Sequence, residues 1–328
     1  MGLAMATNLQ THLLSTTSAS NPLHYHNRTP SRGAPLAALG AVPHPTASSL
    51  AAAADIIFLS LADDAALTAT LDAILLLPSP VSGDDEQQTL PVDLSHKIVV
   101  DTSTVHPSSS SAAAARLQER GAAYVAAPVF GASPVAARGE LLFVVAGRPA
   151  AAVEAAVGAE RPWMVGVMAR AVVGVGEDVR RAGLVKTVGN FVTAGMMELI
   201  SEAHVFAEKS GLGSEAMEAL LEQQYGPLAF NMSKRLTTGA YMPPKGERPW
   251  SSLELALKDV GHGIKCAEEA GTSLEVGEVA LRHLEEAKKF SDAQGRPLDS
   301  SSMYGVLRQQ AGLPFETNQV QQRDTDDA

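Results

Sequence analysis

The sequence lacks several features that would place it in common protein classes. Cys266 is the single cysteine among 328 residues, which excludes an intramolecular disulfide and fits a reducing compartment, so we expect a cytoplasmic protein. No excess of positive charge is present, since 25 basic residues face 36 acidic ones, and the formal net charge is −11. Without a basic patch, a nucleic-acid partner is not expected. No apolar run reaches transmembrane length and the first residues lack the basic start of a signal peptide, so no membrane partner is expected.

The chain is long enough for two domains, and 45% of its residues are hydrophobic. Up to about residue 175, short apolar runs alternate with stretches of helical spacing, as in a mostly parallel, doubly wound sheet. After residue 183 the pattern predicts helices only. Expected strands are 23–26, 55–61, 97–101, 122–127, 141–146 and 171–175, and expected helices in the second part are 183–211, 214–224, 228–237, 251–271, 273–290 and 301–311.

These patterns give a domain organisation. Residues 1–181 are expected to form an α/β domain, residues 182–313 an all-α domain, and the polar, acidic residues 314–328 a disordered tail. In doubly wound sheets, ligands bind at the carboxyl ends of the strands. This rule selects the segments 27–29, 61–64, 102–104 and 128–132 as candidate site segments.

Lys186 lies in the most apolar helical stretch of the sequence. Asn190 follows four residues later, so both side chains share one face of a helix. A helix that is apolar on nearly every side is buried, and burial lowers the pKa of a lysine towards neutrality, which suits a general acid or base. The alternative is a lysine whose stem lies in the core while its amino group reaches water.

Four motifs, in this order, resemble those of the β-hydroxyacid dehydrogenase family, which includes 3-hydroxyisobutyrate dehydrogenase and glyoxylate/succinic semialdehyde reductases and is related to 6-phosphogluconate dehydrogenase. The motifs are Asn27-Arg28-Thr29; Asp101-Thr-Ser-Thr-Val-His-Pro107; Ala127-Pro-Val-Phe-Gly-Ala132 with Gly139-Glu-Leu141; and Lys186…Asn190 with Lys258-Asp259. The resemblance covers the chain from Met1 to about Leu313. It implies a Rossmann-like cofactor domain followed by an all-α domain.

The resemblance implies NAD(P)-dependent hydride transfer on a small β-hydroxy acid or its aldehyde or keto form, of the 3-hydroxyisobutyrate or glyoxylate/succinic semialdehyde type. Lys186 would be the general acid/base, and Asn190 would keep lysine and substrate in register. Ser103 would contact the substrate, and the backbone amides of Gly131 and Ala132 could hold its carboxylate, as turn amides often hold anions.

Other matched positions are expected to contact the cofactor. Lys258 would close over nicotinamide and substrate, although Lys258-Asp259 alone also fits an ordinary surface pair. The remaining expected cofactor residues are Gly2, Asn27, Arg28, Thr29, Leu61, Ala62 and Thr104. No metal ligand is expected.

The turn at Asn27-Arg28-Thr29 bears on the choice of cofactor. NAD enzymes usually place an acidic residue at the end of the second strand to bind the ribose hydroxyls. This turn has no acid, and an arginine can clamp a 2′-phosphate, so NADP(H) is favoured over NAD(H). An arginine in an exposed turn without that role is the alternative.

Two departures from the family pattern concern the substrate. Phe130 stands where a serine is usual, and Ala132 replaces a second glycine. A tighter, more apolar pocket is expected, which favours a small or aldehyde-like substrate over a polar sugar acid.

The glycine-rich turn G-x-G-x-x-G and the strand before it are absent, and Gly2 resembles the third glycine of that motif. We therefore expect a sheet that lacks its first strand, with two inner edges unpaired. Either the sequence is an incomplete version of a longer chain, or it is a product that binds cofactor poorly. For this chain we expect weak NADPH binding and low activity, and a fluorescence titration that gives micromolar or tighter affinity would refute this.

Two other functions remain open. A non-catalytic relative could keep the fold for assembly or ligand sensing, but it would not need a lysine in an apolar helix. An imine reductase of the same fold would generally replace Lys186. Family members are commonly dimers or tetramers, so a homodimer or homotetramer is expected.

Overall fold

The computed structural model describes residues 1–16, 22–75, 94–158 and 163–326. Its contacts divide the chain into two compact units, Met1–Lys186 and Thr187–Ala328. The division falls within a helix, five residues after the expected boundary between residues 181 and 182. None of the described helices is long and apolar enough to cross a membrane.

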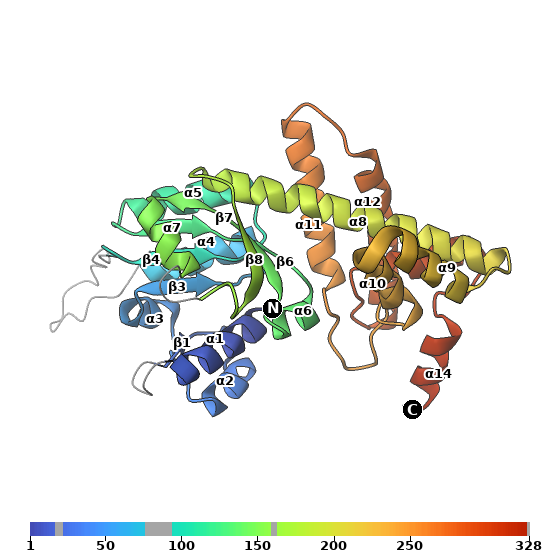
Figure 1. Ribbon diagram of the computed structural model, residues 1–328, viewed down its shortest axis with the longest axis horizontal. Coiled ribbons are helices and arrows are strands. Elements are labelled where there is room, and N and C mark those ends of the chain that lie inside the picture. The colour runs from blue at the N-terminus through green and yellow to red at the C-terminus, as the bar shows by residue number, and fades with distance from the viewer. Residues whose placement is uncertain (17–21, 76–93, 159–162, 327–328) are drawn as a thin grey trace. The chain divides into compact units, whose positions relative to one another are not determined.

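Unit 1 alternates strands and helices (Figure 1). Its strands are β1 (His24–Tyr25), β2 (Val42–Pro43), β3 (Ile56–Leu59), β4 (Ile98–Asp101), β5 (Ala123–Ala126), β6 (Val129–Phe130), β7 (Leu141–Arg148) and β8 (Ala169–Gly174). Its helices are α1 (Gly2–Thr16), α2 (Ala34–Ala38), α3 (Ala47–Ala53), α4 (Asp64–Leu75), α5 (Pro107–Gln118), α6 (Ser133–Ala137) and α7 (Ala150–Val157), with a 3-10 turn, η1, at Pro30–Gly33. Helix α8 (Val179–Lys209) begins in unit 1 and continues into unit 2.

The strands form two sheets. Six of them form one sheet of order β3-β4-β5-β7-β6, in which β8 also pairs with β7, while β1 pairs with β2 in a separate parallel sheet. Strands β3, β4 and β5 are parallel to one another, and β7 is antiparallel to β5. Among the described residues, β1 and β3 each pair on one side only. This confirms a Rossmann-like sheet that lacks its first strand.

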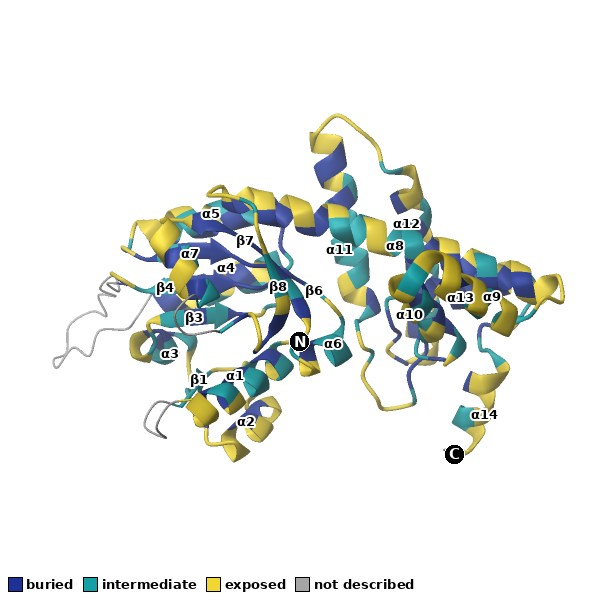
Figure 2. Cartoon of the chain, viewed as in Figure 1, coloured by how far each residue is buried: buried dark blue, intermediate teal, exposed yellow. Residues whose placement is uncertain are grey.

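Helices cover both faces of the six-stranded sheet because successive side chains of a strand point to opposite faces. Val99 packs with α4, α5 and the start of α8, while its neighbour Val100 packs with α1, α6 and α7. Along β7, Val144 packs on the same face as Val99, and Phe143 packs on the same face as Val100. Figure 2 shows the strands mostly in the colour of buried residues and the outer faces of the helices exposed.

The described part of unit 2 is built of helices and connecting loops. Besides most of α8 it contains α9 (Ser214–Leu220), a π-helical turn η2 (Leu221–Tyr225), α10 (Gly226–Thr237), α11 (Leu253–Glu269), α12 (Glu275–Gln294), α13 (Met303–Gln310) and α14 (Asn318–Asp326). An aromatic group lies in its core. The rings of Phe290 and Phe315 stack at 3.8 Å, and Tyr241 meets Tyr304 edge-on at 5.2 Å.

The prediction that residues 314–328 form a disordered tail is wrong for the described residues 314–326. Phe315 and Val320 are buried in the core of unit 2, and α14 begins at Asn318. The hydroxyl of Tyr241 donates to the carbonyl oxygen of Phe315 and accepts from the backbone N–H of Thr317, each at 2.9 Å. Two apolar anchors and these bonds order a segment whose composition is mostly polar.

Candidate active site

The carboxyl ends of β3 and β4 are joined by side chains of the segment after β4. The backbone N–H of Leu61 donates to Oγ of Ser103 at 2.9 Å, and Oγ1 of Thr102 donates to the carbonyl oxygen of Leu59 at 2.6 Å. Two predicted site segments, Leu61-Ala62 and Ser103-Thr104, therefore lie beside each other. Ser103 is buried, and its hydroxyl holds the two strand ends together.

Asp101, the last residue of β4, lies beneath these segments and is buried. Its Oδ1 accepts the backbone N–H of Ser103 at 2.9 Å, and its Oδ2 accepts the hydroxyl of Tyr124 at 2.8 Å. Burial raises the pKa of the Asp101 carboxyl, although hydrogen bonds from Ser103 and Tyr124 oppose this rise. Burial, with the nearby Asp101 carboxyl, also raises the pKa of the Tyr124 phenol well above its ordinary value.

Lys186 lies near the start of α8, where the helix packs closely on α5. A Cβ on Gly183 would come within 3.3 Å of the Pro107 ring, so the glycine permits this approach. The side chain of Lys186 is only 8% exposed, and its Nζ lies 4.3 Å from the centre of the Phe130 ring. Lys186 is therefore a largely buried lysine beside an aromatic ring.

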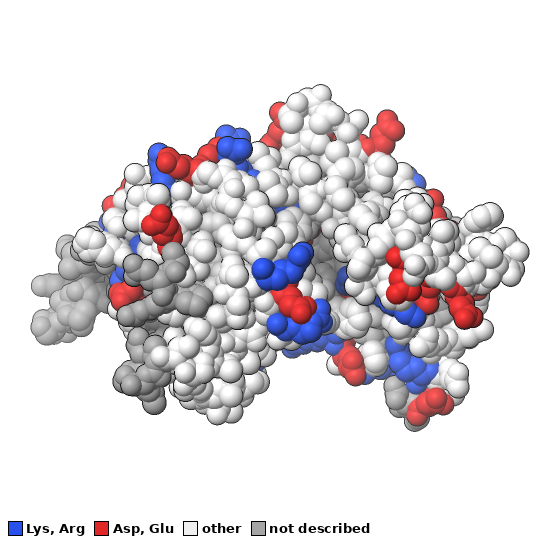
Figure 3. All heavy atoms as spheres, in the orientation of Figure 1, with Lys and Arg blue, Asp and Glu red and all other residues white. Residues whose placement is uncertain are grey.

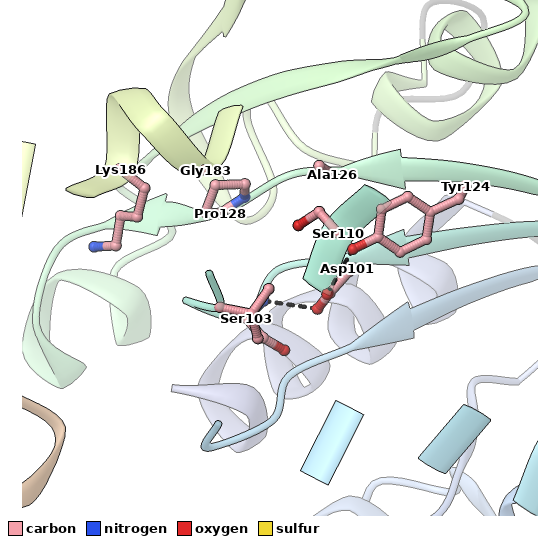
Figure 4. A pocket seen from close by; sticks show the side chains of 9 residues that line it. Asp101, Ser103, Ser110, Tyr124, Ala126, Pro128, Gly183 and Lys186 are labelled. Atoms are coloured by element: carbon pink, nitrogen blue, oxygen red, sulfur yellow. Dashed lines mark hydrogen bonds between the residues drawn. The ribbon is translucent and has the colours of Figure 1, made fainter. Parts of the chain in front are cut away.

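Residues of β4, β5 and α8 line one pocket in unit 1 (Figure 4). Its polar lining consists of Asp101, Ser103, Ser110, Tyr124 and Lys186. The amino group of Lys186 points away from the pair formed by Asp101 and Tyr124. A buried cation and a buried acid thus border the same pocket, with Ser103 between them in the view of Figure 4.

Asn190 and Lys258 meet at one carboxylate in unit 2. Nδ2 of Asn190 donates to Oδ2 of Asp259 at 2.9 Å. Nζ of Lys258 lies 2.9 Å from Oδ1 of the same aspartate, in an ion pair whose side chains are 18% and 20% exposed. The pair is thus not the exposed surface pair that the motif alone allowed. Asn190 is also one helical turn from Lys186 on α8.

Two predicted cofactor segments lie at the amino end of the chain. A Cβ on Gly2, the first residue of α1, would come within 3.1 Å of the Ser60 side chain, so glycine favours the close approach of α1 to the end of β3. The third glycine of a dinucleotide fingerprint has this packing role, so the position fits a dinucleotide-binding turn. Asn27, Arg28 and Thr29 are exposed after β1, where Nδ2 of Asn27 donates to the carbonyl oxygen of Thr29 at 2.6 Å.

The predicted anion-holding turn, Gly131-Ala132, follows β6. Gly131 has a φ of +131°, and a Cβ there would lie 2.7 Å from the Leu141 side chain. Ala132 is the N-cap residue of the short helix α6, with extended backbone. The turn is therefore fixed by glycine-specific conformation and by packing.

Three residues that contact predicted site residues, two in unit 1 and one in unit 2, were not themselves predicted as site residues. Asp101 and Tyr124 form the buried pair beneath the strand ends, and Asp259 joins Asn190 to Lys258. The sequence carried a signal for Asp101, because it ends an otherwise apolar strand at the edge where ligands bind. Figure 3 shows basic and acidic side chains interspersed on the face drawn, without a continuous basic stripe there.

Two family models match this chain. The model described as the NAD binding domain of 6-phosphogluconate dehydrogenase matches residues 1–157. The model described as NAD-binding of NADP-dependent 3-hydroxyisobutyrate dehydrogenase matches residues 181–307.

Named relatives extend these matches over almost the whole chain. The NADH-dependent oxidoreductase ucdB of Aspergillus ustus is 32% identical over 322 residues, covering 97% of this chain and 99% of that protein. The 2-(hydroxymethyl)glutarate dehydrogenase of Eubacterium barkeri is 27% identical over 273 residues, covering 82% and 81%. The crystal structure of 3-hydroxyisobutyrate dehydrogenase from Salmonella typhimurium has the same fold, with a TM-score of 0.72 at 19% identity over 92% of this chain and 96% of that one.

Proposed function

Because this chain belongs to the β-hydroxyacid dehydrogenase family of NAD(P)-dependent oxidoreductases, we propose that it transfers a hydride between NADP(H) and a small β-hydroxy acid or its aldehyde or keto form. Substrates of the 3-hydroxyisobutyrate or glyoxylate/succinic semialdehyde type are the proposed class. The observation that carries the proposal is Lys186, a cation with 8% exposure that lines the same pocket of unit 1 as Ser103 and Asp101.

The bound nicotinamide supplies or accepts the hydride, and the residues of this chain manage the proton. In reduction, Lys186 donates a proton from Nζ to the carbonyl oxygen, and in oxidation it accepts the proton of the hydroxyl. Asn190 keeps lysine and substrate in register, and the bond from its Nδ2 to Asp259 fixes the orientation of its amide. Lys258, held by the same carboxylate, closes over the nicotinamide and substrate.

The substrate is oriented by groups at the strand ends. The hydroxyl of Ser103 contacts the substrate, and the backbone amides of Gly131 and Ala132 hold its carboxylate. The conformation of Gly131, whose φ is +131° and which leaves no room for a Cβ, supports this role, because amides of such turns often hold anions. Thr104, Leu61 and Ala62 face the cofactor at the ends of β4 and β3.

A screen with a lysine variant tests the proposed activity. NADPH oxidation would be measured with glyoxylate, succinic semialdehyde and methylmalonate semialdehyde, and the reverse reaction with their hydroxy acids. Lys186→Ala is expected to lower kcat by roughly 10²- to 10⁴-fold, the usual contribution of a general acid. Lys209→Ala, on an exposed position of the same helix, is the matched control and should keep the rate. Full activity of Lys186→Ala would remove the lysine from the mechanism.

Arg28 is the basis for proposing NADP(H) over NAD(H). It is exposed in a turn without an acidic residue, beside Asn27 and Thr29, where a guanidinium can receive a 2′-phosphate. The relative from Aspergillus ustus is named NADH-dependent, so the preference needs a direct comparison. Arg28→Ala is expected to lower kcat/KM for NADPH by about tenfold, the loss of one charge-assisted contact, and to leave NADH within about twofold. Equal losses for both cofactors would contradict the preference.

We further propose that the protein is a homodimer or homotetramer that associates through α8. Val192, Leu199 and Phe206 recur at seven-residue intervals along this helix and are 48%, 66% and 72% exposed. An exposed apolar row of this kind favours a self-complementary contact. The double variant Leu199→Glu/Phe206→Glu should elute as a monomer in size-exclusion chromatography with light scattering, while Glu202→Lys beside the row should not. A wild-type monomer at micromolar concentration would exclude the association.

The proposed location is the cytoplasm, because Cys266 is the single cysteine of the sequence. Fluorescence microscopy of the tagged chain in its own cells would test this, and an organellar signal would contradict it.

A further inference from the structure

Phe130 provides the aromatic face nearest to the proposed proton donor. Nζ of Lys186 lies 4.3 Å from the centre of its ring, well inside the range of about 6 Å over which a ring face attracts a cation. The contact involves a lysine that is largely removed from water. Because water screens such attractions, a desolvated ammonium is held more strongly than an exposed one.

The backbone of Phe130 is part of the sheet. Phe130 ends β6 and pairs with Leu142 of β7 in the antiparallel ladder. At the next residue, Gly131, φ is +131° and a Cβ would lie 2.7 Å from the Leu141 side chain, so the turn after the ring depends on glycine. The backbone that carries the ring is therefore held in the ladder, whereas the lysine side chain has four rotatable bonds.

We propose that Phe130 is the positioning residue of this site, and that its ring face holds the ammonium of Lys186 in place for proton transfer. The proposal rests on the proposed function, in which Lys186 is the general acid/base. A ring face attracts the charged ammonium and not the neutral amine, so the hold is strongest in the form that donates the proton. A hydroxyl side chain at position 130 would instead accept a hydrogen bond from a single N–H of Lys186.

A test independent of catalysis uses the reactivity of Lys186. Trace labelling with acetic anhydride, read by peptide mass spectrometry from pH 6 to 11, gives the rate at each lysine as a function of pH. In Phe130→Leu and Phe130→Met, the midpoint of the Lys186 curve should move to lower pH by about 0.5–1.5 units, the strength of a cation–π contact. Easier access of the reagent would instead scale the whole curve without moving its midpoint.

The controls separate the ring from general packing. Phe130→Tyr keeps the ring face and should match the wild type, and Phe58→Leu removes a half-buried ring from β3 and should also match it. Asp101 and Tyr124, the titratable groups that line the same pocket, are unchanged in all variants. The curves of Lys97 and Lys209 serve as internal references.

Kinetics then links the contact to the reaction. Phe130→Leu should lower kcat about fivefold to thirtyfold with KM within about twofold, and Phe130→Tyr should restore kcat. If the wild type reduces none of the carbonyl compounds, the proposed function fails, but the labelling curves still decide the proposal. An unmoved midpoint in Phe130→Leu and Phe130→Met, or an equal shift in Phe58→Leu, overturns it.

Discussion

Replacing Asp101 by alanine or by asparagine separates the hydrogen bonds that this buried carboxyl accepts from its ionisation. Alanine leaves the backbone N–H of Ser103 and the hydroxyl of Tyr124 without their acceptor. Each buried donor left unsatisfied costs about 1–3 kcal/mol, so Asp101→Ala should lower the free energy of unfolding of unit 1 by about 2–6 kcal/mol. Asparagine keeps an acceptor for Ser103, and its amide can donate to the Tyr124 oxygen, so Asp101→Asn should cost only about 1 kcal/mol.

Both replacements also change the pH dependence of stability relative to the wild type. Burial raises the pKa of Asp101, so the folded state binds this proton more tightly than the unfolded state, whose pKa is near 3.8. The contribution of Asp101 is therefore complete below pH 3.8 and is lost as the pH rises through the raised pKa. Asparagine does not titrate, so the stability of Asp101→Asn relative to the wild type should increase with pH over that window.

Hydrogen exchange of individual peptides, measured as a function of urea concentration, gives these differences for each unit. Peptides from β4 report on unit 1, and peptides from α12 report on unit 2 and should be unchanged. Asp72→Asn is the matched control, because the Asp72 side chain is 52% exposed and its ion pair with Arg116 is worth little. The reasoning is refuted if Asp101→Asn costs as much as Asp101→Ala, or if the stability of Asp101→Asn relative to the wild type does not change with pH.

Three further predictions concern other parts of the fold. Burial raises the pKa of Glu198, whose Oε1 lies 2.6 Å from Nδ1 of His283, so Glu198→Gln should gain stability relative to the wild type as the pH rises above about 4.5, as measured by exchange of α12 peptides. Tyr241→Phe removes the hydroxyl that bonds the segment around Phe315, so it should cost about 1–3 kcal/mol and speed proteolysis within residues 314–326; an unchanged cleavage rate would contradict the docking of this segment. Gly131→Ala combines a strained φ with an overpacked contact, so it should cost about 2–6 kcal/mol in urea denaturation; a loss below 1 kcal/mol would mean that the turn can shift.

The strands were predictable because buried parallel strands have a simple signature. The apolar runs at 55–61 and 97–101 became β3 and β4, and the helical spacing after residue 183 became α8. Such patterns consist of apolar residues at regular spacing, which can be seen directly in a sequence. The tail was not predictable in this way, because two buried residues, Phe315 and Val320, order a segment whose other residues are mostly polar.

The candidate site was predictable only in part. The strand-end rule and the motifs selected Ser103 and Lys186, which line the same pocket. They included Asp259 only as the neighbour of Lys258 and did not indicate Tyr124, because both act through contacts with residues distant in sequence. The contact between Lys186 and Phe130 was likewise invisible, since the sequence shows only that an aromatic residue stands in the motif.

The one-sided pairing of β3 has a consequence for handling the protein. Its four residues, Ile56–Leu59, are all large and apolar, and in the part of the chain that the structure describes only β4 pairs with them. An apolar edge strand without proline or charge is a template on which a strand of another molecule can add. Concentrated solutions of this chain should therefore form β-rich aggregates that bind thioflavin, and Phe58→Lys should suppress them. Such aggregation would deplete the active protein as its concentration rises, whatever the state of the site.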